Sequence, residues 1–431
     1  MANKGAFKTK YLIIGNSAGG IGAAEAIRET DKKNPITIVS DEPYPAYSRP
    51  LISEYLACER TVDQMLFRPA DFYDRNNINL VLGKKVNNLD LPGHIVELDS
   101  GEKIRWQKLL LATGGIPIVP KMKGLNKKGV FTFLTLDDAK AIDKYVNDYN
   151  RAVVIGGGLI GVSVTEALTK RGIKVTIVEM KDRVLNTILD ERASAMAGET
   201  LAQAGISVIV NNTVTEIVGD KAVEGVTLGS GEAVPCNLVV IAIGVLPRTE
   251  LVQGTDIKIN RGVLVDRYMA TSHPDVYACG DVAEAYDFVL DANRLTPVWP
   301  NAYIGGRVAG YNMAGVKKEY PGGTAMNSVN YFGFDVATAG IVNSTDGNYE
   351  VLTVEAGGTY QKILISDGLI VGMVFVKDIE KSGMVFGLMR DRVDVSGFKQ
   401  SLLAQDFGLA CMPRDLWQER LGSAPLLVNK S

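Results

Sequence analysis

The sequence predicts an α/β protein with two doubly wound, three-layer parallel-sheet regions and a smaller α+β region behind them. Three observations support this prediction. The stretch 11–22, YLIIGNSAGGIG, passes from a short apolar strand through a glycine turn into a helical pattern. The stretch 151–179 repeats the same strand, turn and helix and adds a second strand. After Pro321 the pattern changes to alternating strand-like segments, which is typical of a separate α+β domain.

Length and composition agree with a folded protein of several domains. With 431 residues, the chain is too long for one ordinary core and is expected to form two or three domains. Its hydrophobic content of 46% and its 45 glycines are typical of an α/β protein. The net charge of −3 gives no general reason to expect a nucleic-acid partner. Because no apolar run reaches the length of a membrane span and no signal peptide is apparent, we expect a cytoplasmic protein without a membrane partner.

The first glycine turn has the chemistry of a dinucleotide site. Gly15 follows the apolar strand and Gly20 lies in the helical pattern, so the spacing is G-x-S-x-x-G with Ser17 at the usual middle glycine. A pyrophosphate in this turn would face backbone N–H groups at the positive end of the helix dipole. The residues expected at this turn are Gly15, Ser17, Ala18 and Gly19.

Two acids and one arginine follow the next predicted strand, 36–39. In dinucleotide-binding folds the end of this strand holds a carboxylate for the adenosine ribose hydroxyls. Asp41 and Glu42 are both available, and Asp41 is favoured; the alternative is that both are solvated loop acids. A loop rich in proline and tyrosine then leads to Arg49 and to a helix from about Pro50. Arg49 is placed to meet a phosphate, unless it is a surface side chain.

Two later strands end in residues that suit a bound ligand. The predicted strand 108–117 contains Thr113 and Gly114, whose small size lets a ligand approach the backbone. The segment 275–283, DVYACGDVA, places Asp281 behind a glycine at the end of a short strand. The Asp281 carboxylate has the right chemistry to accept hydrogen bonds from polyol hydroxyls.

Hairpin-like patterns occur in two further parts of the chain. The segment 81–98 is predicted to be a hairpin region, with turn signals at 87–88 and 92–93. In the C-terminal region, 360–366 and 369–376 are predicted strands, and helix-like stretches follow to the end of the chain.

The second βαβ unit, 151–179, carries an intact G-x-G-x-x-G pattern. Glu179 closes its second strand, where a carboxylate binds the ribose 2′-hydroxyl and repels a 2′-phosphate. This favours NAD over NADP, although Lys181 and Arg183 nearby weaken the preference. The three glycines of the pattern are Gly156, Gly158 and Gly161.

Cysteine and histidine usage gives no sign of metal or thiol chemistry. The four cysteines lie far apart without a C-x-x-C pair, which argues against an iron–sulfur cluster, a structural zinc or a local redox disulfide. Buried or partly buried free thiols are expected instead. The two histidines, His94 and His273, lack the neighbours of a metal ligand. The cysteines are Cys58, Cys236, Cys279 and Cys411.

As a set, the motifs resemble the FAD-dependent pyridine-nucleotide oxidoreductases over most of residues 8–320. Residues 47–53, YSRPLIS, are similar to the branch of rubredoxin, ferredoxin and putidaredoxin reductases and the flavin part of assimilatory nitrite reductases. The segment 330–335, NYFGFD, is similar to flavoproteins encoded with carbon monoxide dehydrogenases and their ferredoxin-like partners. The motifs are the two glycine turns, the A-T-G-G turn at 112–115, the A-I-G turn at 242–244 and the C-G-D segment at 279–281.

The resemblance implies two Rossmann-like domains, the second inserted in the first, and a C-terminal α+β domain that covers the flavin and supplies a homodimer interface. The implied bounds are 1–116 and 248–322 for the FAD domain, 117–247 for the NAD domain and 323–431 for the C-terminal domain. The implied FAD contacts are Gly15, Ser17, Ala18, Gly19, Asp41, Arg49, Pro50, Ala112, Thr113, Gly114, Gly280, Asp281 (on the ribityl chain), Val298 and Trp299 (near the flavin ring). The implied NAD contacts are Gly156, Gly158, Leu159, Ile160, Gly161, Glu179, Ile243 and Gly244.

The chain departs from the thiol-using members of this superfamily. Those relatives place a redox cysteine in or just after the loop that leads into the helix, at a position that corresponds to Pro50 here. Cys58 lies further along and is expected to pack within the helix. The C-terminal segment also lacks the histidine that disulfide reductases use as acid and base. The resemblance therefore implies that electrons leave directly from the flavin, without a catalytic side chain and without a metal.

A lysine–glutamate pair that many relatives keep beside the flavin is also missing. The lysine position is Glu54 and the glutamate position is Ser163. Losing both avoids an uncompensated buried charge, which would be costly. It also removes a cation that would favour the reduced, anionic flavin, so we expect a lower or differently divided flavin potential.

The expected function is electron transfer between NAD(H) and a one-electron iron–sulfur protein of the ferredoxin or rubredoxin type. NADH gives up two electrons at once and an iron–sulfur centre exchanges one, and a flavin can do both. Two alternatives stay open: an NADH oxidase that uses oxygen, and a non-catalytic flavoprotein that signals or scaffolds according to its redox state. The sequence names neither the carrier nor the direction of transfer.

Overall fold

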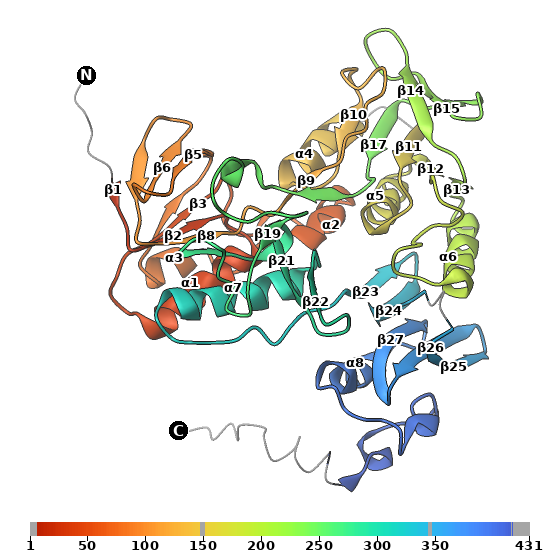
Figure 1. Cartoon of the computed structure of the whole chain (residues 1–431). Coiled ribbons are helices and arrows are strands. Elements are labelled where there is room, and N and C mark those ends of the chain that lie inside the picture. Colours follow the sequence, from red (N-terminus) through yellow and green to blue (C-terminus); the bar gives the residue numbers. More distant parts are fainter. Residues whose placement is uncertain (1–6, 147–150, 344–346, 415, 417–431) are drawn as a thin grey trace. The chain divides into compact units, whose positions relative to one another are not determined.

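The computed structural model describes residues 7–146, 151–343, 347–414 and 416 (Figure 1). The chain divides into two compact units, Met1–Leu185 with Gly198–Ala325, and Asn186–Ala197 with Met326–Ser431. Among the described residues, no helix combines the length and the apolar character that crossing a lipid bilayer requires.

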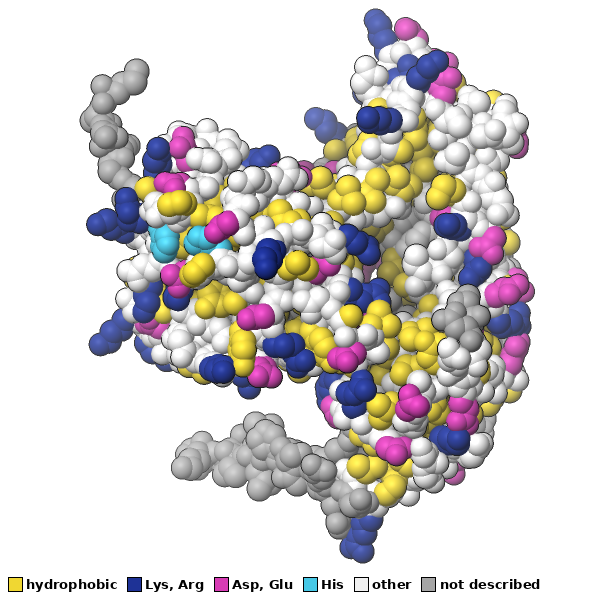
Figure 2. Space-filling model, viewed as in Figure 1, with side chains coloured by type: hydrophobic (Ala, Val, Ile, Leu, Met, Phe, Trp, Pro, Cys, Tyr) yellow, Lys and Arg dark blue, Asp and Glu magenta, His cyan; other side chains and the backbone are white. Residues whose placement is uncertain are grey.

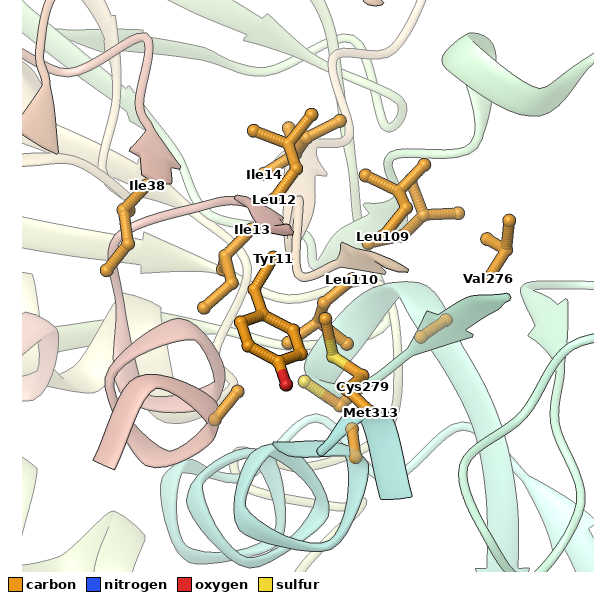
Figure 3. Close-up of a cluster of buried hydrophobic side chains, with 14 of the residues drawn as sticks. Tyr11, Leu12, Ile13, Ile14, Ile38, Leu109, Leu110, Val276, Cys279 and Met313 are labelled. Atoms are coloured by element: carbon orange, nitrogen blue, oxygen red, sulfur yellow. The ribbon is translucent and has the colours of Figure 1, made fainter. Parts of the chain in front are cut away.

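The first large sheet is parallel, and its three inner strands are almost fully buried. Strand-to-strand pairing runs β20 (Val276–Ala278), β8 (Lys108–Leu111), β2 (Tyr11–Ile14), β3 (Ile36–Val39) and β4 (Ile78–Val81). Continuous apolar runs such as YLII and ITIV are typical of parallel strands covered on both faces. Figure 3 shows Tyr11 and Ile13 directed toward the helices and Leu12 and Ile14 toward the opposite face, as the two-residue period of a strand requires.

Two helices lie together on one face of this sheet, α1 (Ala18–Thr30) and α7 (Trp299–Met313) (Figure 1). Their backbones touch at glycines. A Cβ at Gly306 would lie 2.0 Å from the carbonyl oxygen of Gly19, and a Cβ at Gly310 would lie 2.4 Å from that of Ala23. These contacts make the two helices run parallel and place the start of α1 beside the middle of α7.

A smaller sheet covers the other side of the same core. Its strands pair in the order β1 (Phe7–Lys8), β7 (Lys103–Arg105), β6 (Ile95–Leu98) and β5 (Val86–Asp90). The predicted turn at 92–93 joins β5 to β6. The predicted turn at 87–88 is wrong, because these asparagines lie inside β5, where a register shift between Val86 and Asn88 accommodates them.

The second large sheet is also parallel and comes from the middle of the chain. Its order is β10 (Val130–Thr132), β17 (Leu238–Ile241), β11 (Arg151–Ile155), β12 (Lys174–Val178) and β13 (Ser207–Ile209). Because strands of the first sheet precede and follow these residues, the chain leaves the first sheet and later returns to it. The domain bounds given above stay a prediction. The helices of this region are α4 (Leu136–Tyr145), α5 (Leu159–Lys170) and α6 (Glu191–Gln203).

Short elements complete the first unit. The connections between the two large sheets form an antiparallel pair, β9 (Gly115–Pro117) and β18 (Val245–Pro247). The remaining elements are α2 (Ile52–Leu56), α3 (Phe72–Arg75), β14 (Val214–Val218), β15 (Gly225–Leu228), β16 (Ala233–Pro235), β19 (Val263–Leu264), β21 (Ala283–Asp287) and β22 (Ala292–Arg294).

The second unit contains an antiparallel sheet in the order β23 (Met326–Tyr331), β24 (Phe334–Gly340), β27 (Leu369–Val376), β26 (Thr359–Ser366) and β25 (Glu350–Ala356). The strands predicted at 360–366 and 369–376 are confirmed as β26 and β27. Helix α8 (Ser382–Arg390) packs on β27 and β24. The helical pattern expected near the C-terminus extends beyond the described residues.

A segment from the middle of the chain belongs to this second unit. The Asp190 carboxylate accepts hydrogen bonds from the Tyr360 hydroxyl at 2.6 Å and from Lys362 Nζ at 2.9 Å. Arg192 forms an ion pair with Glu355. The start of α6 is therefore bonded to β25 and β26, which sequence analysis did not predict.

Candidate functional site

The first glycine turn has the geometry expected from its sequence. Gly15 has a φ of +119°, and a Cβ there would lie 2.0 Å from the carbonyl oxygen of Ala112. A Cβ at Gly20 would lie 2.0 Å from the carbonyl oxygen of Gly15, so the helix can approach the strand only with glycine at both positions. Ser17 is the N-cap of α1, and its side chain makes no capping hydrogen bond. The backbone N–H groups of Ala18, Gly19 and Gly20, which precede the first intrahelical hydrogen bond from Ile21 to Ser17, are therefore available to an anion.

Four predicted FAD segments meet at one edge of the first parallel sheet. Strands β2, β3, β8 and β20 are parallel neighbours, so their C-terminal ends lie along the same edge. These ends lead into Gly15, Asp41, Thr113 and Asp281 respectively. The structure brings the segments together, whereas their individual contacts with FAD stay a prediction.

Asp41 is exposed and is held by a residue that sequence analysis did not assign. Its carboxylate accepts a hydrogen bond from Arg248 Nη1 at 2.6 Å. The Arg248 backbone in turn binds the A-T-G-G turn: its N–H donates to the Gly114 carbonyl at 2.9 Å, and its carbonyl accepts from Thr113 Oγ1 at 3.0 Å. Asp41 keeps further lone pairs that can accept from ribose hydroxyls.

Arg49 is fixed on two sides and is not a free surface side chain. Its Nη2 donates to Glu42 Oε1 at 2.5 Å, and its Nη1 donates to the carbonyl oxygen of Leu134 at 2.9 Å. It opens the short 3₁₀ helix 49–51, with Pro50 as the next residue. The guanidinium has five N–H donors, so it retains donors for a phosphate. Sequence analysis missed Glu42 as the partner, and its position beside Asp41 was the one available signal.

Among the residues that the structure describes, Asp281 is an acceptor without a hydrogen-bond donor. Burial raises the pKa of its carboxyl, and the positive charge of Arg49 opposes that rise. Within the described ranges, the Asp281 side chain makes no hydrogen bond or ion pair. Gly280, with a φ of +75°, turns the chain just before it. Such a carboxylate fits the hydroxyls of a ribityl chain.

An aromatic cluster surrounds the start of α7. Val298 is the N-cap and Trp299 is the first helical residue. The Trp299 ring meets Phe67 edge-on, with centroids 5.2 Å apart, and Phe67 meets Tyr303 at 6.0 Å. Sequence analysis named Trp299 and Val298 but not the two neighbouring rings, which come from a loop and from the next helical turn.

The second glycine turn repeats the geometry of the first. Gly156 has a φ of +107°, and a Cβ at Gly161 would lie 1.9 Å from the Gly156 carbonyl oxygen. At Gly158 a Cβ would have no atom within 4 Å among the described residues, so this side of the turn is open to a ligand. The predicted contacts that open α5 are Leu159 and Ile160, both partly buried.

Glu179 and Ile243 follow the ends of β12 and β17. Because these strands are parallel to β11, both residues lie beside the second glycine turn. The buried Glu179 carboxylate accepts from the backbone N–H of Gly157 at 2.7 Å and from that of Lys181 at 2.7 Å. Sequence analysis assigned Glu179 to the ribose and missed its bond to the glycine turn. Ile243 is 39% exposed at the strand end, and Gly244 follows it.

The residues that replace the lysine–glutamate pair lie on packed helices. Glu54 lies in α2 and forms an ion pair with Arg60, which follows that helix. Ser163 lies in α5, which contacts α2. The acid at the lysine position is therefore neutralised by an arginine of its own segment.

All four cysteines are free thiols, but one expectation about them is wrong. Cys58 is exposed and has a φ of +61°, because α2 ends at Leu56 and the chain turns before Cys58. Cys236 and Cys279 are buried, and burial raises the pKa of each thiol to about 12. Both stay protonated and unreactive at neutral pH.

These features fit FAD at the first turn and NAD(H) at the second. The first site combines an open helix N-terminus, a nearby cation at Arg49 and the carboxylate of Asp281, which accepts no hydrogen bond from the described residues. The second combines an open Gly158 with a buried carboxylate at Glu179.

Comparisons with known proteins agree with this assignment. A family model described as pyridine nucleotide-disulphide oxidoreductase matches residues 9–314. A model described as the rubredoxin NAD+ reductase C-terminal domain matches residues 326–393. The NADH-dependent phenylglyoxylate dehydrogenase subunit epsilon of Aromatoleum evansii is 31% identical over 402 residues, 92% of this chain and 95% of that protein.

Two further comparisons bear on length and fold. The nitrite reductase [NAD(P)H] of Bacillus subtilis (strain 168) is 30% identical over 90% of this chain, and the match spans 48% of that relative. The chain thus corresponds to about half of the nitrite reductase. The crystal structure of NADH:rubredoxin oxidoreductase from Clostridium acetobutylicum superposes with a TM-score of 0.74 and 26% identity, covering 90% of this chain and 97% of that one.

The matched family agrees with the two nucleotide turns and with the parallel sheets that carry them. The resemblance to the FAD-dependent pyridine-nucleotide oxidoreductases is therefore confirmed. The chain therefore belongs to the pyridine nucleotide-disulphide oxidoreductase family and is an FAD-dependent NAD(P)H oxidoreductase.

Proposed function

We propose that this enzyme passes electrons between NADH and a one-electron iron–sulfur protein of the ferredoxin or rubredoxin type, without a redox-active thiol. The observation that carries the proposal is the presence of two nucleotide turns together with the absence of a cysteine at the predicted redox position, which Pro50 occupies. When bound, FAD accepts two electrons together and releases them one at a time.

The chain's own residues bind and orient in this scheme. The helix N-terminus at Ala18 and the Arg49 cation would hold the FAD pyrophosphate, and Asp281 would hold the ribityl chain. The turn at Gly158 and the Glu179 carboxylate would hold NADH. No side chain is required to move a proton, which agrees with a sequence that has only two histidines.

The names of similar proteins support an iron–sulfur acceptor. Relatives include an NADH-rubredoxin oxidoreductase of Clostridium acetobutylicum and a rubredoxin-NAD(+) reductase of Pseudomonas putida. On the face drawn in Figure 2, lysines and arginines are interspersed with acids, so charge sign alone does not mark a docking surface there.

An anaerobic experiment tests the proposal. The purified flavoprotein is reduced with NADH and then mixed, in separate arms, with a ferredoxin, a rubredoxin and oxygen, while flavin absorbance is followed. We expect an iron–sulfur protein to reoxidise the flavin faster than oxygen does. Faster reoxidation by oxygen would assign an NADH oxidase. A long-lived charge-transfer band with no reoxidation by any carrier would assign a redox-signalling flavoprotein.

A homodimer in the cytoplasm, with no nucleic-acid or membrane partner, is also part of the proposal. Support comes from β25, which lies at the edge of the antiparallel sheet and leaves Val351 and Val354 exposed by 46% and 42%. Exposed apolar residues on an edge strand are typical of a surface that pairs with another chain. Sedimentation equilibrium is expected to give twice the chain mass, and a monomer at micromolar concentration would contradict this.

A further inference from the structure

Glu42, an acid that the predicted FAD site does not include, lies near the start of the loop between β3 and α2. We propose that Glu42 is a positioning residue for FAD, which keeps the Arg49 cation away from Asp281 and so leaves both groups available to the cofactor. The proposal rests on the FAD site described above and is independent of the electron acceptor.

Both oxygens of the Glu42 carboxylate are in use. Oε1 accepts from Arg49 Nη2, and Oε2 accepts from the Tyr47 hydroxyl at 2.5 Å. The Glu42 side chain is 18% exposed, and Tyr47 is 5% exposed. Hydrogen bonds between charged partners that are partly buried from solvent are stronger than those on an exposed surface. Glu42 is therefore held in one orientation, and it holds Arg49 in turn.

The same cluster is tied to the turn that begins α4. Arg49 Nη1 donates to the Leu134 carbonyl at 2.9 Å, and the Tyr47 hydroxyl accepts from the Leu136 N–H at 3.0 Å. That turn is itself closed by a capping box between Thr135 and Asp138. Glu42 and its two partners are thus fixed against backbone that follows β10.

The loop is also bonded to the first glycine turn. Asn16 Nδ2 donates to the Tyr44 carbonyl at 3.3 Å, and Asn16 Oδ1 accepts from the Tyr73 hydroxyl at 2.8 Å. The Ala46 N–H donates to that same Tyr73 hydroxyl at 2.9 Å. Asn16 lies directly between Gly15 and Ser17, so the loop that carries Glu42 is positioned relative to the pyrophosphate turn.

Competition for the Arg49 charge explains why Glu42 matters. Arg49 lies close enough to Asp281 to oppose the burial-driven rise in the pKa of that carboxyl. Asp281 nevertheless makes no ion pair with it among the described residues, where the guanidinium donates instead to the Glu42 carboxylate and to the Leu134 carbonyl. Without the Glu42 charge, Arg49 would be drawn to Asp281, since a buried carboxylate attracts the nearest free cation. That pairing would occupy the acceptor that the ribityl hydroxyls need.

A double-mutant cycle on FAD binding tests this inference. Apoproteins of the wild type, Glu42→Gln, Arg49→Met and the double variant are titrated with FAD, and the Kd is read from quenching of flavin fluorescence. Glu97→Gln, which removes a partly exposed acid paired with Lys103, is the matched control. We expect Glu42→Gln to raise the Kd about tenfold or more and Glu97→Gln to leave it unchanged. In the Arg49→Met background, Glu42→Gln is expected to have no further effect.

Two results would overturn the proposal. One is a wild-type Kd in Glu42→Gln, and the other is the same increase in both backgrounds, which a purely structural role would give. Near-UV circular dichroism and the Tm of each apoprotein show whether it folds. If Glu42→Gln does not fold, Tyr47→Phe replaces it in the cycle, because it removes one bond to Glu42 and keeps the ring. Since no acceptor is present, a failure of the proposed electron transfer would not affect this test.

Discussion

The carboxylate of Glu179 accepts a hydrogen bond from the backbone N–H of Gly157 at 2.7 Å, so the acid proposed for the NAD ribose also braces the glycine turn of the same site. Its second oxygen binds the Lys181 N–H. If Glu179 also binds the ribose as proposed, one side chain serves both the shape of the turn and the selection of the nucleotide, and changes there should affect both.

Replacing Glu179 should weaken NADH binding without producing an efficient NADPH enzyme. In Glu179→Ala the Gly157 N–H loses a charged acceptor, a loss worth about 1.5–3 kcal/mol. We expect the Kd for NADH to rise by about tenfold to a hundredfold. The Kd of the variant for NADPH should stay higher than the Kd of the wild type for NADH, although Lys181 and Arg183 lie nearby. Stopped-flow titration under anaerobic conditions measures both constants. A variant that prefers NADPH at wild-type affinity would contradict the bracing role.

Two glycines of the second turn should respond differently to alanine. In Gly161→Ala the new Cβ would lie 1.9 Å from the Gly156 carbonyl oxygen, so α5 must move away from its strand. We expect this variant to lose about 1–3 kcal/mol of stability, which thermal unfolding would detect. In Gly158→Ala the Cβ meets no described atom within 4 Å, so the Tm should stay unchanged while NADH binds more weakly. Equal Tm losses in both variants would contradict this distinction.

Restoring the missing lysine–glutamate pair should raise the flavin potential. The double variant Glu54→Lys with Ser163→Glu would place a cation on α2 and an acid on the facing helix α5. A cation near the flavin favours its reduced, anionic form, and we expect a rise of about 30 mV or more, which corresponds to about 1.4 kcal/mol for a two-electron couple. Equilibration with redox dyes measures the midpoint, and Glu54→Gln serves as the uncharged control. An unchanged midpoint, or a wild-type midpoint as high as that of lysine-bearing relatives, would count against the hypothesis.

Alkylation should distinguish the exposed thiol from the buried thiols, and it should leave turnover unchanged. Burial raises the pKa of Cys236 and Cys279 to about 12, which favours the neutral thiol at every pH well below that value. Iodoacetamide at pH 8 is therefore expected to modify the exposed Cys58 and to spare these two in the folded protein. Mass spectrometry locates the modification, and NADH-dependent reduction of the carrier should be unchanged in both the alkylated protein and Cys58→Ser. Loss of turnover in either would show that a thiol takes part.

Long-range contacts decided the features that the sequence left unpredicted. Cys58 was expected within a helix, but α2 is short and the chain turns after it. The role of Glu42 depends on Arg49 and on the backbone of Leu134, which lies 85 residues beyond Arg49. Arg248 reaches Asp41 from 207 residues away. Sequence spacing carries no record of such pairings, because they depend on how separate strand–helix units pack against one another.

The sequence by itself determined both nucleotide turns, most of the parallel strands and the family to which the chain belongs. These features are local: a turn with positive φ and a helix that touches the preceding backbone tolerate only glycine, and a covered strand must be apolar throughout. Only the tertiary structure decided which charges meet around those turns, because ion pairs and buried carboxylates acquire their partners when distant loops come together.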